Sequence, residues 1–368
     1  MKDRMRNTRN ILIFIFSLYL FLLSIQGIGS SIGFFGKDFA RALISTTSVP
    51  MLGLIIGIFV TSVTQSSSCT TSITVGLVSA GAISLEGSIP IIMGANIGTS
   101  VTNILVSMGM IGNKSEFRRA FGGAIVHDFF NLFCVILLFP LEVHFHLIQK
   151  TAEVFSGVLE GVGGIKIASP LKLVTKPAES LVLGLIQIVT GEGTIMSGVI
   201  GIIVFLAILF FSLSSLSRTM KMLIIGKVQN LMHSYIFANP ARSLILGLML
   251  TAVIQSSSVT TSLIVPLVGA GILNIYQIYP YILGANLGTT VTAFLAALAT
   301  GNPLSVTAAM SHFTFNLTGI LIFYPLKAIP ISLALWFSGI VTKKRFFAVL
   351  YVILFFFIIP LLLLLFFN

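Results

Sequence analysis

Hydroxyl and amide side chains are concentrated in two matching strings of eight residues. The first string, QSSSCTTS, covers residues 65–72, and the second, QSSSVTTS, covers residues 255–262. Hydroxyls and amides can donate hydrogen bonds to an oxyanion, and the free N–H groups at the start of a helix add donors and a favourable dipole. We therefore predict that both strings line one site for a small anion. Its candidate residues are Gln65, Ser66, Ser67, Ser68, Gln255, Ser256, Ser257 and Ser258.

A second pair of matching strings follows the first pair at the same distance in both halves of the chain. GANIGTSVT covers residues 94–102, and GANLGTTVT covers residues 284–292. These strings combine glycines, which permit close backbone approach, with hydroxyl and amide oxygens of the kind that hard cations prefer. The chain is therefore predicted to contain two copies of one polar unit.

The rest of the composition places these polar strings inside a membrane. Hydrophobic residues make up 56% of the 368 residues, charged residues make up 8%, and the mean hydropathy is +1.07. A soluble domain does not need so apolar a chain, so we predict a polytopic membrane protein. Hydroxyls and amides at membrane depth are costly unless a partner or a ligand satisfies them.

The basic residues are grouped in a way that indicates membrane orientation. The formal net charge is +11, but the Lys and Arg residues fall mainly in four segments rather than in one nucleic-acid-binding stretch. Because basic residues accumulate on the cytoplasmic side of a membrane, we assign these segments and the N-terminus to the cytoplasm, and we expect no nucleic-acid partner. The four segments contain Lys2, Arg4, Arg6 and Arg9; Lys114, Arg118 and Arg119; Arg218, Lys221, Lys227 and Arg242; and Lys327, Lys343, Lys344 and Arg345.

Each octet interrupts an apolar segment that is too short to span the bilayer. Residues 49–63 and 75–83 flank the first octet, and each run is below the roughly 20 residues that a spanning helix requires. We expect a re-entrant hairpin that turns at the octet, followed by a helix broken near Gly94 and Gly98, and near Gly284 and Gly288 in the second copy. One crossing at about residues 195–217 separates the copies, which predicts that the second copy is inverted.

The predicted fold class is an all-α polytopic membrane protein with two inverted repeats, each with a re-entrant QSSS hairpin and a broken transmembrane helix. We expect a bacterial inner membrane, because the loops are short and the outer linker has no cysteine pair. The predicted segments are an N-terminal tail and first helix (1–44), repeat 1 (45–140), an extracytoplasmic linker (141–180), a linking transmembrane helix and cytoplasmic loop (181–236), repeat 2 (237–326), and an interfacial helix followed by a C-terminal transmembrane helix kinked near Pro360 (327–368).

Seven motifs between residues 45 and 345 carry a family resemblance. They are residues 65–68, 89–100, 117–121 (FRRAF), 127–131 (HDFFN), 255–258, 284–290 and 312–316 (HFTFN). In sequence and order these motifs resemble the type II sodium-phosphate cotransporters. The resemblance implies sodium-driven uptake of inorganic phosphate by alternating access, with phosphate and sodium ions bound between the repeats. The implied partners are inorganic phosphate, sodium ions and the lipid bilayer, with no cofactor beyond the co-transported Na+.

Charge balance is an independent argument for a co-transported cation. No Lys or Arg stands near either octet in the sequence, so a phosphate dianion at membrane depth would lack a counter-charge. Sodium ions beside the anion would supply that charge, and oxygens of the second repeat could bind them, including backbone carbonyls freed by a break at residues 284–288. The resemblance adds positions from the first repeat. The candidate sodium ligands are Gln255, Ser256, Thr289, Thr292, Asn96, Thr99, Asn286, Asp128 and Asn131.

Asp128 is the acidic residue among the predicted inner helices of the first repeat. It precedes Asn131 by three residues, so the two side chains share a helix face. In the family that the sequence resembles, an aspartate at this position accompanies an additional sodium ion and net charge transfer. The resemblance therefore implies an electrogenic carrier of the divalent form of phosphate.

Several alternatives remain open from the residues. Ser67, His127 and Asp128 contain the groups of a serine hydrolase, but adjacent residues project about 100° apart on a helix and cannot align as base and orienting acid, so we predict no enzyme. An anion channel or a sodium-coupled carrier of another oxyanion would also suit the octets. His127 and His312 are expected to be interhelical hydrogen-bond partners. Cys69 and Cys134 form no disulfide framework and no zinc-ligand spacing.

Overall fold

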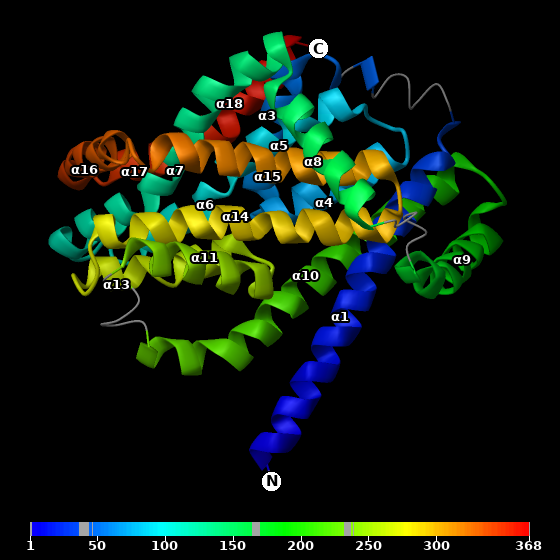
Figure 1. Ribbon diagram of the computed structural model, residues 1–368, viewed down its shortest axis with the longest axis horizontal. Helices are drawn as coiled ribbons and strands as arrows, with labels where there is room; N and C mark the ends of the chain where they lie inside the picture. The colour runs from blue at the N-terminus through cyan, green and yellow to red at the C-terminus, as the bar shows by residue number, and fades with distance from the viewer. Residues whose placement is uncertain are drawn as a thin grey trace.

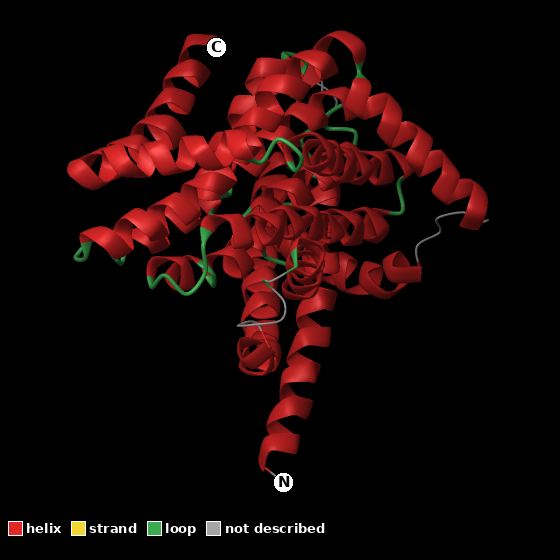
Figure 2. Ribbon diagram, turned by 60° about the vertical axis from the view of Figure 1, so that its left-hand side comes forward, coloured by secondary structure: helices red, strands yellow, loops and turns green. Residues whose placement is uncertain are grey.

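The computed structural model describes residues 2–36, 44, 45, 47–163, 170–231, 237 and 239–367. Within these residues the chain is helical and contains no strand (Figure 2). Seven of these helical segments are long and apolar enough to cross a membrane, which confirms the predicted class of all-α polytopic membrane protein. They are Thr8–Gly33, Leu85–Met108, Lys114–Phe145, Ile195–Leu216, Ile275–Thr300, Pro303–Phe323 and Phe346–Phe366.

Figure 1 shows the order of the helices along the chain. They are α1 (Lys2–Gly33), α3 (Pro50–Thr64), α4 (Ser67–Ser79), α5 (Leu85–Gly98), α6 (Ser100–Met108), α7 (Lys114–Phe145), α8 (Leu147–Gly163), α9 (Pro170–Thr190), α10 (Ile195–Leu231), α11 (Pro240–Ile254), α12 (Ser257–Ser262), α13 (Val265–Gly269), α14 (Ile275–Thr300), α15 (Pro303–Phe323), α16 (Ala328–Lys343), α17 (Phe346–Ile353), the π-helical turn η2 (Leu354–Ile358) and α18 (Ile359–Phe367).

Both QSSS strings form the turn of a hairpin made of short helices. In the first hairpin, α3 ends at Gln65, which has a left-handed backbone (φ 56°), and α4 begins directly after Ser66. In the second hairpin, α11 ends at Gln255 (φ 61°), and α12 begins directly after Ser256. With 15 residues in α3 and in α11, neither incoming helix reaches the length of a spanning helix. The hairpins expected from the sequence are therefore present at both octets.

The two hairpins start from opposite ends of α14. At one end, Arg119 Nε of α7 donates a 2.8 Å hydrogen bond to the carbonyl of Gly269, six residues before α14 begins. At the other end, Asn302 Nδ2, just after α14, donates a 3.1 Å hydrogen bond to the carbonyl of Ser79, where α4 ends. A helix of 26 residues is about 39 Å long. The hairpins therefore point toward each other along α14, and their tips meet part-way.

The first repeat has the predicted helix break, and the second repeat does not. Thr99, directly after Gly98, interrupts the helical hydrogen bonding between α5 and α6. By contrast, α14 continues without a break through Gly284 and Gly288, so the expected break there was wrong. These glycines instead admit the backbone of α11, since a Cβ at Gly284 would lie 2.8 Å from the Leu244 carbonyl carbon. Close helix packing therefore accounts for the glycines, and no backbone carbonyls are freed at this point.

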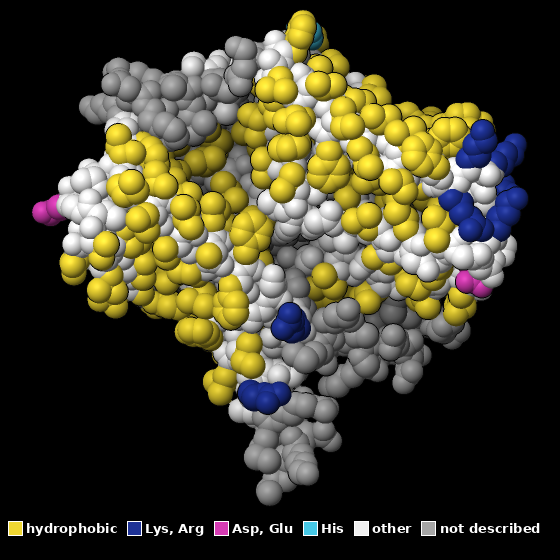
Figure 3. All heavy atoms as spheres, turned by 180° about the vertical axis from the view of Figure 1, so that it is seen from behind, with side chains coloured by type: hydrophobic (Ala, Val, Ile, Leu, Met, Phe, Trp, Pro, Cys, Tyr) yellow, Lys and Arg dark blue, Asp and Glu magenta, His cyan; other side chains and the backbone are white. Residues whose placement is uncertain are grey.

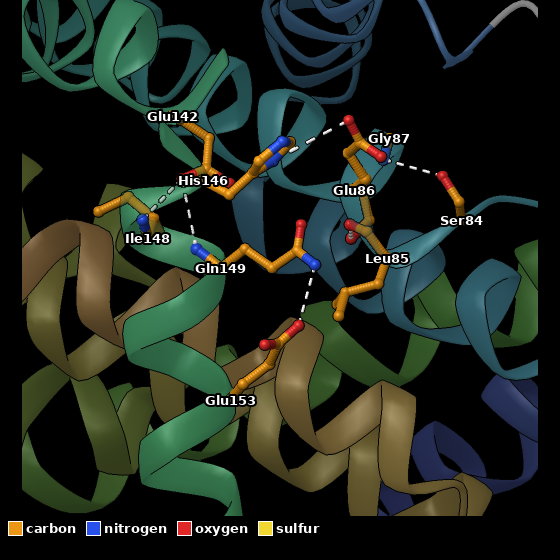
Figure 4. Close-up of polar contacts among 10 residues, drawn as sticks. Ser84, Leu85, Glu86, Gly87, Glu142, His146, Ile148, Gln149 and Glu153 are labelled. Atoms are coloured by element: carbon orange, nitrogen blue, oxygen red, sulfur yellow. Dashed lines mark hydrogen bonds and ion pairs between the residues drawn. The ribbon is translucent and has the colours of Figure 1, made fainter. Parts of the chain in front are cut away.

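A polar cluster lies at the start of α5, which follows the first hairpin in the chain (Figure 4). His146 has a left-handed backbone (φ 51°) and turns the chain from α7 into α8. Glu142 Oε2 accepts hydrogen bonds from the N–H groups of Ile148 (2.6 Å) and Gln149 (3.3 Å), and so caps the first turn of α8. His146 Nδ1 also lies 4.0 Å from Glu86 Oε1, at the start of α5. These contacts join α5, α7 and α8 at one corner.

The segment between the repeats contains more helix than the sequence predicted. The expected short helix at the start of the linker is α8, but most of the remaining linker and the following residues form α9, up to Thr190. Residues 191–194 then turn the chain into α10, whose apolar part matches the crossing predicted at about residues 195–217. Helix α10 packs against α1, and the N-terminal part of α1 projects from the helical body (Figures 1 and 2).

The C-terminal helix is distorted just before Pro360. The chain passes from α17 through the π-helical turn η2 into α18, so the predicted irregularity is present as a π-helical turn. Proline lacks the N–H group that an α-helix would use, which favours local rearrangement of the ladder. Helix α16, predicted to be interfacial, packs one face on α7.

One face of the described part of the molecule is largely apolar. Figure 3 shows hydrophobic side chains across the middle of one face and Lys and Arg side chains gathered at one end. Arg119 bonds to the base of the second hairpin, and the Arg118 guanidinium lies 3.7 Å from where a Cβ at Gly339 would be. The basic start of α7 and the basic end of α16 therefore lie near each other, as grouping on one membrane side requires.

Candidate functional site

The tips of the two hairpins enclose one side of a polar pocket of about 420 Å³. Gln65 and Ser66 line it from the first hairpin, and Gln255 and Ser256 line it from the second. Ser68 Oγ donates a 3.2 Å hydrogen bond to the carbonyl of Gln255, which ties the tips directly to each other. The tertiary structure therefore brings the two octets together, as a shared site requires.

The serines at the helix starts are arranged to offer protons to an anion. Ser66 Oγ accepts a 3.2 Å hydrogen bond from the N–H of Cys69, and Ser256 Oγ accepts a 3.3 Å hydrogen bond from the N–H of Val259. These are N-cap bonds, which use the hydroxyl oxygen and leave its proton for another acceptor. Both serines also line the pocket, so an oxyanion there could accept that proton and meet the positive ends of α4 and α12.

Both glutamine side chains form hydrogen bonds, Gln65 to its own hairpin and to α6, and Gln255 to its own hairpin. Gln65 Oε1 accepts a 3.0 Å hydrogen bond from Thr102 Oγ1, and Gln65 Nε2 lies 3.3 Å from the carbonyl of Ser62. Gln255 Nε2 donates to the carbonyl of Ala252. The non-glycine left-handed backbone at both positions is unfavourable. Glycine would adopt this backbone more easily. The presence of glutamine at both positions therefore indicates that the side-chain amide has a role.

A basic residue lies at this pocket, contrary to our expectation from the sequence. The linking helix α10 contributes Phe210, Leu213, Ser214 and Arg218 to the lining. Arg218 is the one charged residue among the described residues that line the pocket. The expectation that no Lys or Arg stands near the octets was therefore wrong, because Arg218 is distant from both octets in the sequence and α10 brings it to them.

The other four candidate serines of the octets do not line the pocket. Ser67, Ser68, Ser257 and Ser258 are buried, with 2–6% of each residue exposed. The carbonyl of Ser67 accepts a 2.8 Å hydrogen bond from Thr71 Oγ1, and the carbonyl of Ser257 accepts one of 2.7 Å from Thr261 Oγ1. These positions lie in the first turns behind the tips, so a ligand reaches them only if the tips move.

A buried hydrogen-bond chain links the repeats beside the tips. Thr261 Oγ1 of α12 lies 2.9 Å from Asn103 Oδ1 of α6, so this oxygen and the Ser257 carbonyl share the one hydroxyl proton. Asn103 Nδ2 lies 3.3 Å from His127 Nδ1. His127 Nε2 in turn lies 2.6 Å from Asn286 Oδ1 of α14. A neutral imidazole that carries its proton on Nε2 satisfies both contacts. The prediction that His127 is an interhelical hydrogen-bond partner is therefore confirmed.

The row of buried hydrogen bonds continues from α14 back into the first repeat. Asn286 Nδ2 donates a 2.7 Å hydrogen bond to Asn131 Oδ1, and Asn131 Nδ2 donates a 2.8 Å hydrogen bond to the carbonyl of Asn96. The Asn96 side chain itself donates to the carbonyl of Ile92 (2.9 Å). Three candidate sodium ligands, Asn286, Asn131 and Asn96, therefore lie together. Asn103, which the sequence analysis did not single out, belongs to the same row of hydrogen bonds. An amide at membrane depth was the signal that could have identified it.

The other candidate sodium ligands are placed separately. Thr99 Oγ1 and Thr289 Oγ1 each donate a 3.0 Å hydrogen bond to the carbonyl four residues earlier, as threonines inside helices commonly do. Thr292 Oγ1 is buried without a hydrogen-bond partner. Both ring nitrogens of His312 are also buried without a partner, so the expectation of an interhelical hydrogen bond at His312 was wrong.

Asp128 lies fully buried in α7, and its carboxylate accepts one hydrogen bond of regular geometry. Tyr351 of α17 donates its hydroxyl proton to Asp128 Oδ2, while Oδ1 has no partner. Among the described residues, no group of three or more His, Cys, Asp or Glu side chains could hold a metal ion. Any cation here must therefore bind to one carboxylate together with hydroxyl, amide or carbonyl oxygens.

The fold and the pocket define a class of protein. Two opposed helical hairpins whose tips meet at a polar pocket within an apolar helical body are an arrangement typical of membrane transporters. The family model described as Na+/Pi-cotransporter matches residues 20–168 and 208–358, and the chain belongs to this family. This family consists of cotransporters and not of enzymes, in agreement with the prediction from the sequence.

Mammalian relatives extend this result. The chain is 33% identical over 423 residues to human sodium-dependent phosphate transport protein 2B, and 34% identical over 403 residues to the rat protein 2A. These alignments cover 90% of the chain but 61% and 63% of the relatives, so the chain spans about three fifths of their length. No solved structure matches the chain.

Proposed function

We propose that the protein is a secondary active symporter that couples inward sodium movement to the uptake of inorganic phosphate. The observation that carries this proposal is the pocket lined by both QSSS tips and by Arg218. Hydroxyl protons, helix N-termini and a guanidinium together form a suitable environment for a tetrahedral oxyanion. The relatives named sodium-dependent phosphate transport proteins support phosphate among the possible oxyanions.

Phosphate binds in this proposal as the divalent anion. The Ser66 and Ser256 hydroxyls donate to its oxygens, and Arg218 offsets one of its two charges. Sodium ions offset the rest and bind to oxygens of Gln255, Ser256, Thr289 and Thr292, and to oxygens around Asp128. A buried dianion is strongly unfavourable without such cations, and this is the physical basis of coupling.

The carrier is electrogenic and works by alternating access in this proposal. An additional sodium ion at Asp128 gives a net positive charge per cycle, and the membrane potential then contributes about 2.3 kcal/mol per charge per 100 mV. The opposed hairpins support alternating access, because each could open the shared pocket toward a different side. We also propose a bacterial inner membrane, with the N-terminus and the basic end of the molecule in the cytoplasm.

The function is tested by uptake of labelled phosphate into proteoliposomes with and without an inward sodium gradient. We expect uptake that requires sodium, saturates with phosphate and rises with the square or a higher power of the sodium concentration. Equal uptake with a potassium gradient would reject the symporter. A linear, non-saturating dependence would favour a channel, and stronger competition by sulfate than by unlabelled phosphate would reject phosphate as the preferred substrate.

Gln255→Gly separates the side chain from the fold in the same assay. Glycine adopts the left-handed backbone of residue 255 without strain, so the hairpin should persist while the amide is lost. We expect folded protein with little uptake. Phosphate-evoked current in a voltage-clamped bilayer tests electrogenicity separately, and normal uptake without current would reject the net charge while leaving the symporter intact.

A further inference from the structure

The surroundings of Asp128 are unequal at its two oxygens. Oδ2 accepts the hydroxyl proton of Tyr351, and Oδ1 makes no hydrogen bond although the residue is fully buried. The hydroxyl of Ser100, at the start of α6, lies near the same carboxylate and is also buried without a regular hydrogen bond. Unsatisfied buried oxygens are costly. Asp128 Oδ1 and Ser100 Oγ are therefore two buried oxygens at one place without a hydrogen bond of regular geometry, and a cation could bind both.

Tyr351 is held firmly by an aromatic cluster. Its ring lies 5.2 Å from that of Phe337 on α16, stacks on Phe355 at 5.4 Å, and meets Phe356 edge-on at 5.8 Å, measured between ring centroids. Phe337 also packs edge-on against Phe129, the neighbour of Asp128 on α7. Aromatic pairs at these separations are favourable, so the position of the hydroxyl is set by packing on three sides.

The helix that carries Tyr351 is irregular directly after this residue. The π-helical turn η2 starts three residues later and contains both Phe355 and Phe356. Single π-helical turns inside α-helices are often found at functional sites, because they re-aim side chains. Here the turn brings Phe355 and Phe356 around the Tyr351 ring, and this fixes the direction of the hydroxyl toward α7.

We propose that Tyr351 is a positioning residue for a sodium ion at Asp128. Its hydroxyl holds Oδ2, which orients the carboxylate and leaves Oδ1 to bind the ion together with the nearby Ser100 hydroxyl. This inference rests on the proposed function, since it takes Asp128 as a sodium ligand. It adds that the C-terminal helix, which lies outside both repeats, is part of the ion site.

Removing the hydroxyl should weaken sodium binding without disturbing packing. Partners that orient a metal ligand typically contribute 10–100-fold to metal affinity. For Tyr351→Phe we therefore expect the sodium concentration for half-maximal phosphate uptake to rise about tenfold. The phosphate concentration for half-maximal uptake, measured at saturating sodium, should change much less. An unchanged sodium requirement in this variant would overturn the inference.

Phe337→Leu is the matched control. It disturbs the same aromatic cluster but leaves the Tyr351 hydroxyl in place, so it should lower thermal stability with little effect on the sodium requirement. If Phe337→Leu shifts the sodium requirement as strongly as Tyr351→Phe does, packing rather than the hydroxyl is responsible. That result would also overturn the inference.

Stabilisation by sodium gives a readout that does not depend on transport. An ion that binds the folded state raises the unfolding temperature, so phosphate-free protein should unfold at higher temperature as sodium replaces choline. We expect Tyr351→Phe to need about tenfold more sodium for the same rise. In an Asp128→Asn background, Tyr351→Phe should add little, because the two residues act through one ion.

These measurements separate failure of the inference from failure of the proposed function. If Asp128→Asn alters the sodium dependence and Tyr351→Phe does not, Asp128 binds sodium without help from Tyr351. If Asp128→Asn also has no effect, the ion is not bound at Asp128, and the inference and the additional sodium ion are both rejected. Sodium-driven uptake by wild-type protein would still support the symporter in either case.

Discussion

At the scale of single residues, the pocket depends on groups that the chain supplies from three places. Ser66 and Ser256 cap the helices of two hairpins, and Arg218 comes from the linking helix. A guanidinium beside hydroxyl donors can form charge-assisted hydrogen bonds to phosphate. In the proposed function, Arg218 offsets part of the anion's charge, and sodium ions then have less charge to compensate than we expected from the sequence.

Arg218→Gln should weaken phosphate binding selectively. A hydrogen bond to a charged group contributes about 1.5–3 kcal/mol, and 1.4 kcal/mol corresponds to a tenfold change in binding. We expect the phosphate concentration for half-maximal uptake to rise at least about tenfold at saturating sodium. Arg218→Lys, which keeps the charge but loses the planar guanidinium, should have a smaller effect.

Lys344→Gln controls for the loss of one positive charge from the protein. Lys344 is exposed at the end of α16 and does not line the pocket. Kinetic measurement of labelled phosphate uptake over a range of phosphate concentrations compares the variants. Equal kinetics for Arg218→Gln and Lys344→Gln would show that Arg218 does not contact the substrate.

At the scale of helices, glycines determine how closely each hairpin packs on the long helix of its own repeat. A Cβ at Gly94 would meet the Leu54 carbonyl of α3, and a Cβ at Gly284 would meet the Leu244 carbonyl of α11. The same relation in both repeats places each incoming hairpin helix directly against α5 or α14. Close backbone contact therefore fixes the depth of both tips, and with it the geometry of the pocket.

Gly284→Ala should destabilise the protein. The added methyl group would force α11 and α14 apart, and overpacking of this kind typically costs about 1–3 kcal/mol. Thermal unfolding of purified protein in detergent measures the effect as a lower midpoint. Gly184→Ala on α9 is the matched control, because no atom lies within 4 Å of its added Cβ.

The control should change stability in the opposite direction. Alanine is favoured over glycine inside a helix by about 0.5–1 kcal/mol, so Gly184→Ala should unfold at the same or a slightly higher temperature. If the two variants unfold at the same midpoint, the contact between α11 and α14 does not set the hairpin depth.

At the scale of the whole molecule, two hairpins approach from opposite ends of α14 and share one pocket. Arg119 at one end and Asn302 at the other fix the hairpin bases, while Ser68 and Gln255 join the tips. The described pocket lies against the part of α10 that contains Ser214 and Arg218, on the way to its predicted cytoplasmic end. We therefore expect the pocket in this conformation to be reached from the cytoplasmic side.

Ser214→Cys tests the accessibility of the pocket. Ser214 is exposed and lines the pocket, whereas the native Cys69 and Cys134 are 0% and 1% exposed and should react little. A membrane-impermeant maleimide should label Ser214→Cys in inside-out vesicles, and sodium together with phosphate should slow this labelling. Labelling that is unaffected by both substrates would contradict a substrate pocket at this position.

The sequence by itself determined the class of protein, the two copies and the hairpin at each octet. These features are local, because the length of an apolar run and an interrupting polar octet decide whether a segment can cross a bilayer. The hydrogen-bonding role of His127 was also predictable, since a polar ring at membrane depth needs partners. The ligand roles assigned to the octets, Asp128 and the threonines remain predictions.

The tertiary structure alone decided the composition of the pocket and the partners of Asp128. Arg218 and Tyr351 are remote in sequence from the groups they approach, and which face of a helix meets which neighbour depends on packing among all helices. Packing also explains why α14 is unbroken. Its glycines allow close contact with α11, and the glycines alone do not show which helix lies against them.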